Sequence, residues 1–229
     1  MSGASSLPAV ALVIPALNEA ESIAGVVEAV RRYGQPIVVD DGSTDGTGVL
    51  AIAAGAVVVT HAANRGYDRA LESGLKRALD DGYDFVVTLD ADGQHKPELL
   101  TPVLEQLFAG ADMVIGVRDR HQRFSESVFS ATGMFLWGIA DPLCGLKGYR
   151  IDRLRSFIGL CTYASIGTEI ALRAARSGWR IAQVPICTSS RKGVSRFGVG
   201  ARANWMILKA LGLGLFRARS FPVRAAVKS

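Results

Sequence analysis

Two aspartates one residue apart, Asp90 and Asp92, are the side chains of this chain best suited to binding a metal ion. They follow residues 83–88, an apolar run that reads as a buried strand. Side chains alternate between the two faces of a regular strand, so both carboxylates can reach one cation only where the strand breaks, here at Gly93. Mg²⁺ and Mn²⁺ are typically bound by carboxylates together with substrate phosphates. The pattern indicates a metal–diphosphate site, and a solvated turn with helix-capping acids is the alternative.

The first half of the chain alternates between apolar runs and segments of helical periodicity. Strands are expected at residues 9–15, 36–40, 56–60, 84–89 and 112–117. Helices are expected at residues 18–32, 47–54, 67–79 and 97–108. Near-continuous apolar strands separated by helices are typical of an α/β fold, a mostly parallel sheet with helices on both faces.

Polar residues gather where four of these strands end. The clusters are residues 15–19, 40–45, 64–66 and 90–94. Ligands of open α/β sheets bind outside the carboxyl ends of the strands, so the clusters are expected to form one site. The first strand is followed by no Gly-x-Gly-x-x-Gly and the chain has no Walker lysine, which argues against a dinucleotide site or a P-loop.

Charge divides the chain into two unlike halves, although 229 residues suit one continuous domain. Residues 1–117 hold 7 Lys and Arg against 16 Asp and Glu, a net charge of −9. Residues 118–229 hold 19 against 5, a net charge of +14. An acidic half that could carry a metal thus precedes a basic half that could meet phosphates or an anionic membrane. On charge alone, nucleic acid would also fit the second half.

No transmembrane helix is expected, because no segment reaches about 18 uninterrupted apolar residues. Residues 123–139 and 205–216 are apolar but shorter than a bilayer-spanning helix. Each could lie in a membrane interface or form a core or dimer helix. Three cysteines without Cys-x-x-Cys spacing indicate buried thiols and a reducing compartment, and His61 is expected at the surface.

Several runs of residues resemble a known family, the inverting family 2 glycosyltransferases of GT-A fold. In the first half they are residues 13–19 (VIPALNE), 39–47 (VDDGSTDGT), 64–66 (NRG) and 89–95 (LDADGQH). In the second half, residues 116–118, 141–150, 184–186 and 191–197 resemble the polyprenyl-phosphate branch, which includes dolichyl-phosphate mannose synthases. The resemblance extends over residues 7–200 and implies a Rossmann-like sheet followed by a less regular acceptor region with amphipathic helices. It also implies a nucleotide-sugar-binding half at 1–117 and an acceptor-binding half at 118–229 within one continuous domain.

The resemblance also implies roles for individual residues. The nucleotide pocket would be formed by Pro15, Leu17, Glu19, Asp40, Asp41 and Asp90, with Asp40 or Asp41 at the base or ribose. The ligands of Mg²⁺ or Mn²⁺ would be Asp90, Asp92 and Gln94. Arg118 would lie near the phosphates, and an acceptor-phosphate loop would contain Arg191, Ser195 and Arg196. Glu169 occupies the position of the catalytic base in relatives that act on sugar hydroxyls.

These roles imply an enzyme of cell-envelope glycan biosynthesis that moves a sugar from a UDP- or GDP-sugar to a polyprenyl phosphate. It would lie on the cytoplasmic face of the membrane, in contact with anionic lipid or a membrane partner protein and not with nucleic acid. It could also form a homo-oligomer. Transfer to a saccharide or small-molecule hydroxyl, with Glu169 as base, is the alternative, and a non-catalytic nucleotide-sugar or membrane-binding module is a third. The chain departs from the branch at Leu146-Lys147-Gly148, where an Arg-Phe-Arg-type run is common, and at Arg196, where lysine is frequent.

Overall fold

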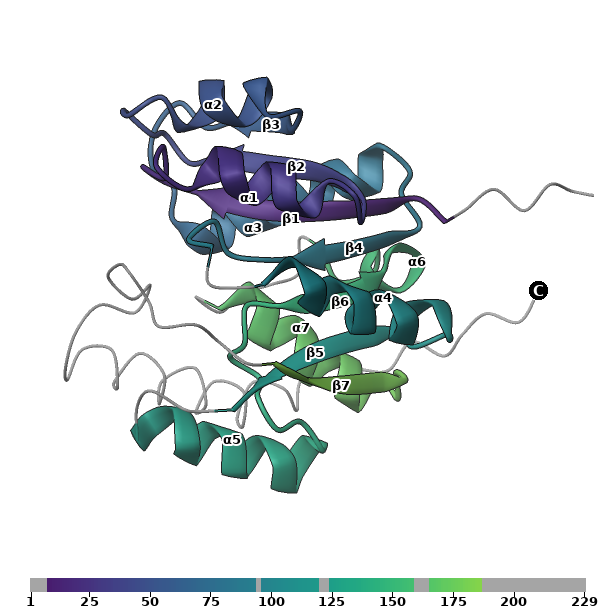
Figure 1. Ribbon diagram of the computed structural model, residues 1–229. Helices are drawn as coiled ribbons and strands as arrows, with labels where there is room; N and C mark the ends of the chain where they lie inside the picture. Colours follow the sequence, from purple (N-terminus) through teal and green to yellow (C-terminus); the bar gives the residue numbers. More distant parts are fainter. Residues whose placement is uncertain (1–7, 94–95, 120–123, 159–164, 187–229) are drawn as a thin grey trace, which may run out of the picture.

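A computed structural model describes residues 8–93, 96–119, 124–158 and 165–186 (Figure 1). Their seven strands form one sheet in the order β3-β2-β1-β4-β6-β5-β7. The strands are β1 Val10–Ala16, β2 Gln35–Asp40, β3 Val57–Thr60, β4 Phe85–Thr88, β5 Met113–Arg118, β6 Lys147–Arg150 and β7 Ile181–Ile186. The helices are α1 Ile23–Val30, α2 Thr47–Ala53, α3 Tyr67–Asp80, α4 Leu100–Phe108, α5 Phe124–Trp137, α6 Ile151–Leu154 and α7 Ile166–Arg176, with a 3₁₀ turn at Pro97–Leu99.

The sheet is mostly parallel. β3, β2, β1 and β4 run in one direction, and β5 pairs in parallel with β7. β6 lies antiparallel between β4 and β5, so β4 and β5 point the same way. The carboxyl ends of β1 to β5 therefore meet at one edge of the sheet, which we call the carboxyl edge. β6 and β7 come from residues after 117 and belong to the same sheet as the first half of the chain.

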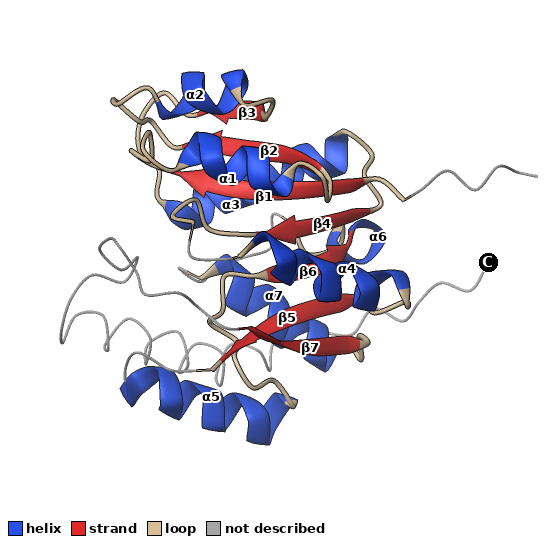
Figure 2. Cartoon of the chain, viewed as in Figure 1, coloured by secondary structure: helices blue, strands red, loops and turns tan. Residues whose placement is uncertain are grey.

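Helices cover both faces of the sheet, with α1 and α4 in front and α3 and α7 behind in Figure 2. The side chains of β1 divide between the two layers. Val10, Leu12 and Ile14 pack into the core beneath α1 and α4, while Ala11 and Val13 pack into the core beneath α3 and α7. A strand buried on both faces is apolar at every position, which is why the first half of the sequence reads as continuous apolar runs. The predicted α/β fold is confirmed.

The structure differs from the sequence expectations at several element boundaries. The helix expected over 18–32 begins only at Ile23, since Asn18 has a φ of 54° and the residues up to Ser22 form turns. The apolar segment 123–139 is the helix α5, whereas 205–216 lies outside the described residues. Four short elements of the second half, β6, α6, α7 and β7, were not predicted. Within the described ranges, no helix is both long and apolar enough to cross a membrane.

Close seating of α3 on the sheet depends on Gly74. A methyl group added there would lie 2.4 Å from Val13 Cγ1 and 3.0 Å from Val39 Cγ2, both on buried strands. The β-branched valines cannot rotate away easily. The missing side chain thus sets how near the helix, and Tyr67 at its start, lies to the strands.

We predict that Gly74→Ala lowers the free energy of unfolding by about 1–3 kcal/mol, the usual cost of overpacking a core. Gly25→Ala is the matched control, because Gly25 is exposed within α1 and an added methyl meets nothing within 4 Å. The control should gain up to about 1 kcal/mol from helix propensity. Urea denaturation measures both, and equal stabilisation of the two variants would contradict the close packing of α3.

Candidate active site

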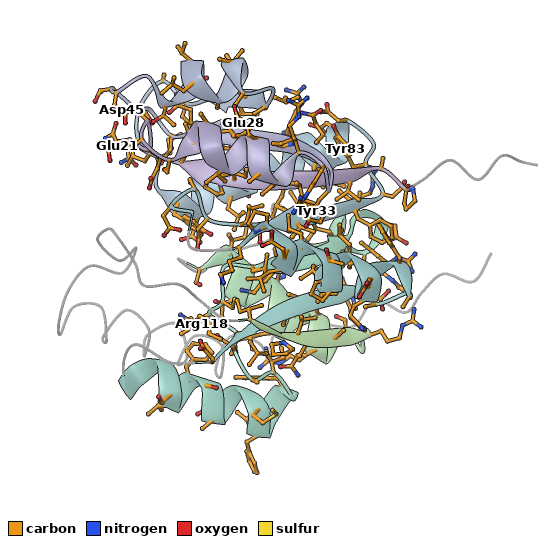
Figure 3. All side chains as sticks on the ribbon, viewed as in Figure 1. Glu21, Glu28, Tyr33, Asp45, Tyr83 and Arg118 are labelled. Atoms are coloured by element: carbon orange, nitrogen blue, oxygen red, sulfur yellow. The ribbon has the colours of Figure 1, made fainter. Side chains whose placement is uncertain are left out.

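Backbone hydrogen bonds hold the loops at the carboxyl edge together. The N–H of Asp41 donates to the carbonyl of Ala16 at 2.9 Å, and the N–H of His61 donates to the carbonyl of Asp40 at 2.9 Å. These bonds continue the pairing of β1, β2 and β3 past the strand ends. In Figure 3, Asp45 and Arg118 lie at this edge, and Tyr33 and Tyr83 lie toward the other end of the strands.

The loop after β1 is fastened to the loop after β2 by side chains. The N–H of Asn18 donates to Ser43 Oγ at 2.9 Å, and Asn18 Oδ1 accepts from the N–H of Thr44 at 2.9 Å. The N–H of Glu19 donates to Thr47 Oγ1 at 2.8 Å. Of the residues predicted for the nucleotide pocket, Pro15 is buried, Glu19 is half-buried and Leu17 is exposed. Of these three, Leu17 alone presents an exposed apolar side chain at this edge.

Asp40 and Asp41, predicted to meet the base or ribose, are both buried, and both form hydrogen bonds with loops at the carboxyl edge. Asp40 Oδ1 accepts from the N–H of Ser43 at 2.9 Å. The Asp41 carboxylate accepts from His61 Nδ1 at 2.6 Å and from the N–H groups of Arg65 and Gly66 at 2.9 and 2.8 Å. Asp41 therefore determines the path of the chain after β3.

His61 is buried, so the expectation of a surface histidine was wrong. An ionised carboxylate can only accept, which makes His61 Nδ1 the donor to Asp41. Its other ring nitrogen, Nε2, lies 2.9 Å from Ser73 Oγ on α3. The imidazole thus joins the end of β2 to a helix. No local pattern marks His61 for burial, because its partners are 20 and 12 residues away.

Asp90 and Asp92 follow β4, and both are half-buried. Asp90 Oδ1 accepts from the hydroxyl of Tyr67 at 3.1 Å. On the other side the carboxylate lies against Gly145, where an added Cβ would be 2.7 Å from Asp90 Oδ2. The backbone just before β6 thus leaves room for the Asp90 carboxylate, which a side chain at position 145 would fill.

The donor set fits a hard divalent cation that also binds phosphate. Among the described residues there is no group of three or more His, Cys, Asp or Glu side chains placed to hold a metal. Two carboxylates are sufficient for Mg²⁺ or Mn²⁺ when substrate phosphates complete the coordination. The third predicted ligand, Gln94, lies outside the described residues.

Arg118 ends β5 at the same edge and is paired with Asp141. Its Nε and Nη2 donate to the two oxygens of Asp141 at 2.7 and 3.0 Å. Asp141 is 1% exposed, whereas Arg118 is half-buried. A two-point contact of this kind fixes the plane of the guanidinium, which a single ion-pair contact would leave free to rotate. The sequence predicted Arg118 but not the aspartate that orients it.

The segment between Asp141 and β6 is densely packed. Lys147 is buried and its ammonium donates to the carbonyl of Cys144. Burial raises the pKa of the Cys144 thiol to about 11, and the neighbouring Asp141 adds to this effect. Cys144 is therefore the buried thiol that the sequence predicted, while Cys161 and Cys187 lie outside the described residues. A cavity of about 10 Å³, the size of one water molecule, adjoins it.

Glu169 lies in the first turn of α7 and is 1% exposed. Its Oε1 accepts from Arg173 Nε and Nη2 at 3.0 and 2.6 Å, one helical turn along. The start of α7 is tied to the start of α3, because the N–H of Ile166 donates to Asp68 Oδ1 at 2.8 Å. Glu169, the predicted base, thus lies near the carboxyl edge and is ion-paired with Arg173. The predicted acceptor-phosphate residues Arg191, Ser195 and Arg196 lie outside the described residues.

The fold agrees with the comparisons to known proteins. Residues 11–167 match the family described as glycosyl transferase family 2. The polyprenol monophosphomannose synthase of Mycolicibacterium smegmatis is 34% identical, over 81% of this chain and 79% of the relative. The undecaprenyl-phosphate mannosyltransferase of Micrococcus luteus is 33% identical, over 88% of this chain and 98% of the relative.

A solved structure has the same architecture. The glucosyl-3-phosphoglycerate synthase of Mycobacterium tuberculosis, in complex with Mn²⁺, UDP and glucosyl-3-phosphoglycerate, is 25% identical with a TM-score of 0.73. The likeness covers 90% of this chain and 79% of the synthase chain. The chain belongs to glycosyl transferase family 2, and it is a glycosyltransferase of GT-A fold.

We predict that Asp41→Ala lowers the free energy of unfolding by about 2–4 kcal/mol, because a buried donor without its acceptor costs about 1–3 kcal/mol. Asp45→Ala is the matched control in the same loop. Asp45 also accepts two backbone N–H groups, from Ala20 and Thr47, but it is exposed, so its loss should cost less. Thermal unfolding followed by circular dichroism measures both.

The effect of Asp45→Ala should also depend on pH. The Thr47 hydroxyl, at 2.6 Å, lowers the pKa of Asp45. A carboxyl with a lowered pKa stabilises the fold at neutral pH and stops doing so as the pH falls through that pKa. The difference between wild type and Asp45→Ala should therefore vanish in acid. A larger loss for Asp45→Ala than for Asp41→Ala at neutral pH would contradict the account of this loop.

Proposed function

We propose that this protein is an inverting, metal-dependent glycosyltransferase that moves a sugar from a nucleoside-diphosphate sugar to a polyprenyl phosphate. The observation that supports it best is the position of Asp90 and Asp92. In a family 2 chain, these two carboxylates stand at the carboxyl edge beside the fastened loops after β1, β2 and β3. That arrangement joins a metal site to a nucleotide pocket.

The donor is proposed to bind with its diphosphate between the acidic pair and Arg118. Asp90 and Asp92, with Gln94, would hold Mg²⁺ or Mn²⁺, which when bound offsets the negative charge that grows on the leaving diphosphate. Arg118 is held in one plane by Asp141, which fixes the orientation in which its guanidinium would meet a phosphate. The similar synthase structure, solved with Mn²⁺ and UDP, supports a divalent metal and a nucleoside diphosphate as the bound molecules.

The base and ribose are proposed to lie on the loop after β1, with Pro15, Leu17 and Glu19. Because Asp40 and Asp41 are occupied by Ser43, His61 and the 65–66 backbone, we assign them to shaping the pocket rather than to direct base contact. Asp40 and Asp41 are thus proposed to belong to the nucleotide site as residues that hold its loops. UDP and GDP donors are both compatible with the arrangement.

A polyprenyl phosphate is the proposed acceptor because two relatives that match over most of their length are named for transfer to such lipids. A phosphate is already an anion at neutral pH and needs no strong general base. The ion pair between Glu169 and Arg173 accords with this chemistry, since it gives the buried carboxylate a structural partner. Arg191, Ser195 and Arg196 are proposed to bind the acceptor phosphate.

A hydroxyl acceptor is the second candidate, favoured by the structural likeness to glucosyl-3-phosphoglycerate synthase. In that case Glu169 would have to accept the proton of the attacking hydroxyl. A base must come within hydrogen-bond reach of that proton. Glu169 would therefore have to turn away from Arg173, or contact Arg173 and the acceptor hydroxyl at the same time. The two candidates therefore differ in what Glu169 does.

We further propose that the protein works at the surface of an anionic membrane. On α5, Met134, Phe135 and Leu136 are exposed by 53, 88 and 46%, and consecutive exposed apolar side chains suit an interface with lipid. Flotation with vesicles containing anionic lipid tests this. Phe135→Asp should reduce the bound fraction, and unchanged flotation would assign α5 another role.

The direct test of the function is product formation from UDP- or GDP-sugars, Mn²⁺ and undecaprenyl phosphate. The wild-type protein should form a lipid-linked sugar with one nucleotide class. Asp92→Asn should lower turnover by about 100-fold or more, because Lewis-acid stabilisation contributes several kcal/mol. Asp81→Asn, at the exposed end of α3, is the charge-matched control and should leave turnover unchanged.

Glu169→Gln separates the two acceptors in the same assay. With a lipid phosphate it should retain most of the turnover after correction for any loss of folded protein. Nucleotide binding without lipid product, or wild-type turnover by Asp92→Asn, would contradict the proposed function. Transfer to a soluble hydroxyl that is abolished by Glu169→Gln would establish the second candidate.

A further inference from the structure

We propose that Tyr67 is a positioning residue that fixes the carboxylate of Asp90 for metal binding. The inference rests on the proposed function, in which Asp90 is a metal ligand. It adds a residue that lies on another element, 23 positions earlier in the chain, and that no pattern of acidic residues would reveal.

The contact that supports the proposal is a hydrogen bond from the Tyr67 hydroxyl to Asp90 Oδ1 at 3.1 Å. A tyrosine is suited to this task because its hydroxyl is neutral at ordinary pH. An arginine or lysine in its place would compete with a cation for the carboxylate charge, whereas a hydroxyl orients the group and leaves that charge intact. Partners that orient a metal ligand in this way commonly alter metal affinity when removed.

The other side of Asp90 is enclosed by backbone. Gly145 faces Asp90 Oδ2 so closely that an added Cβ would lie 2.7 Å away. The carbonyl of Gly145 is itself held by the hydroxyl of Thr88, at 2.8 Å. A fixed backbone on one side and a hydrogen-bond donor on the other restrict the rotation of the carboxylate.

Tyr67 is in turn held in place by the loop that precedes it. It begins α3 directly after Gly66, which has a φ of 88° and whose N–H donates to Asp41 Oδ2 at 2.8 Å. The ring is half-buried and packs against the core beneath α3. The buried Asp41 thus places the tyrosine, and the tyrosine places Asp90. The proposed nucleotide pocket and the proposed metal site are thus connected through the Tyr67 hydroxyl.

Replacing Tyr67 with phenylalanine tests the proposal, because Tyr67→Phe keeps the ring and removes only the hydroxyl. The readout is the affinity for Mn²⁺ in the presence of UDP or GDP, followed by the electron paramagnetic resonance signal of free Mn²⁺. The dissociation constant should rise by about 10–100-fold, the usual effect of losing a group that orients a ligand. Tyr33→Phe is the matched control, since Tyr33 lies toward the opposite end of the strands (Figure 3).

Two further measurements separate positioning from a structural role. The unfolding midpoint of Tyr67→Phe in the presence of a chelator should stay within about a degree or two of wild type. A shift of that size corresponds to only a small change in the free energy of unfolding. Saturating Mn²⁺ should restore most of the lost turnover, because the defect lies in metal affinity.

An unchanged Mn²⁺ dissociation constant in Tyr67→Phe, beside normal Mn²⁺ binding by wild type, would overturn this inference and leave the proposed function standing. A large fall of the metal-free unfolding midpoint would also overturn it, in favour of a structural tyrosine. If wild type with either nucleotide fails to bind Mn²⁺, the proposed function fails and the inference fails with it.

Discussion

The buried carboxylate of Asp41 is the constraint on which the carboxyl edge depends. An ionised group inside a protein must have hydrogen-bond partners, because its desolvation is costly. Asp41 finds them in His61 and in the backbone of residues 65–66, so one side chain after β2 sets the path of the chain from β3 to α3. Its effect reaches Tyr67 and then Asp90, so the proposed nucleotide pocket and the proposed metal site share one framework.

Much of the fold is predictable because β1, β2, β4 and β5 are largely buried on both faces. Such strands are apolar throughout, and the helices between them show regular periodicity, so both signals are local. The start of α1 was misplaced because Asn18 adopts a left-handed conformation to accept the N–H of Thr44, which depends on the next loop. β6 was missed because its sequence, KGYR, has no apolar pattern, and its central position comes from pairing with β4 and β5.

Part of the candidate site was predictable from a local signal, because Asp90 and Asp92 directly follow an apolar run. Arg118 was predicted from the family resemblance, and the roles of all three residues stay proposals. Their partners Tyr67, Asp141 and Gly145 could not be recognised, because each contact joins residues at least 23 positions apart. Sequence patterns thus identify the groups proposed to touch substrate more readily than those that orient them. The acceptor loop at 191–196 stays a prediction.

The most direct test of the account is a crystal structure with Mn²⁺ and the nucleoside diphosphate that the wild-type protein binds. The account predicts the metal between the diphosphate and the carboxylates of Asp90 and Asp92, with Tyr67 still bonded to Asp90 and Asp41 still bonded to His61. Nucleotide bound away from the carboxyl edge, or a metal with no contact to either aspartate, would contradict it.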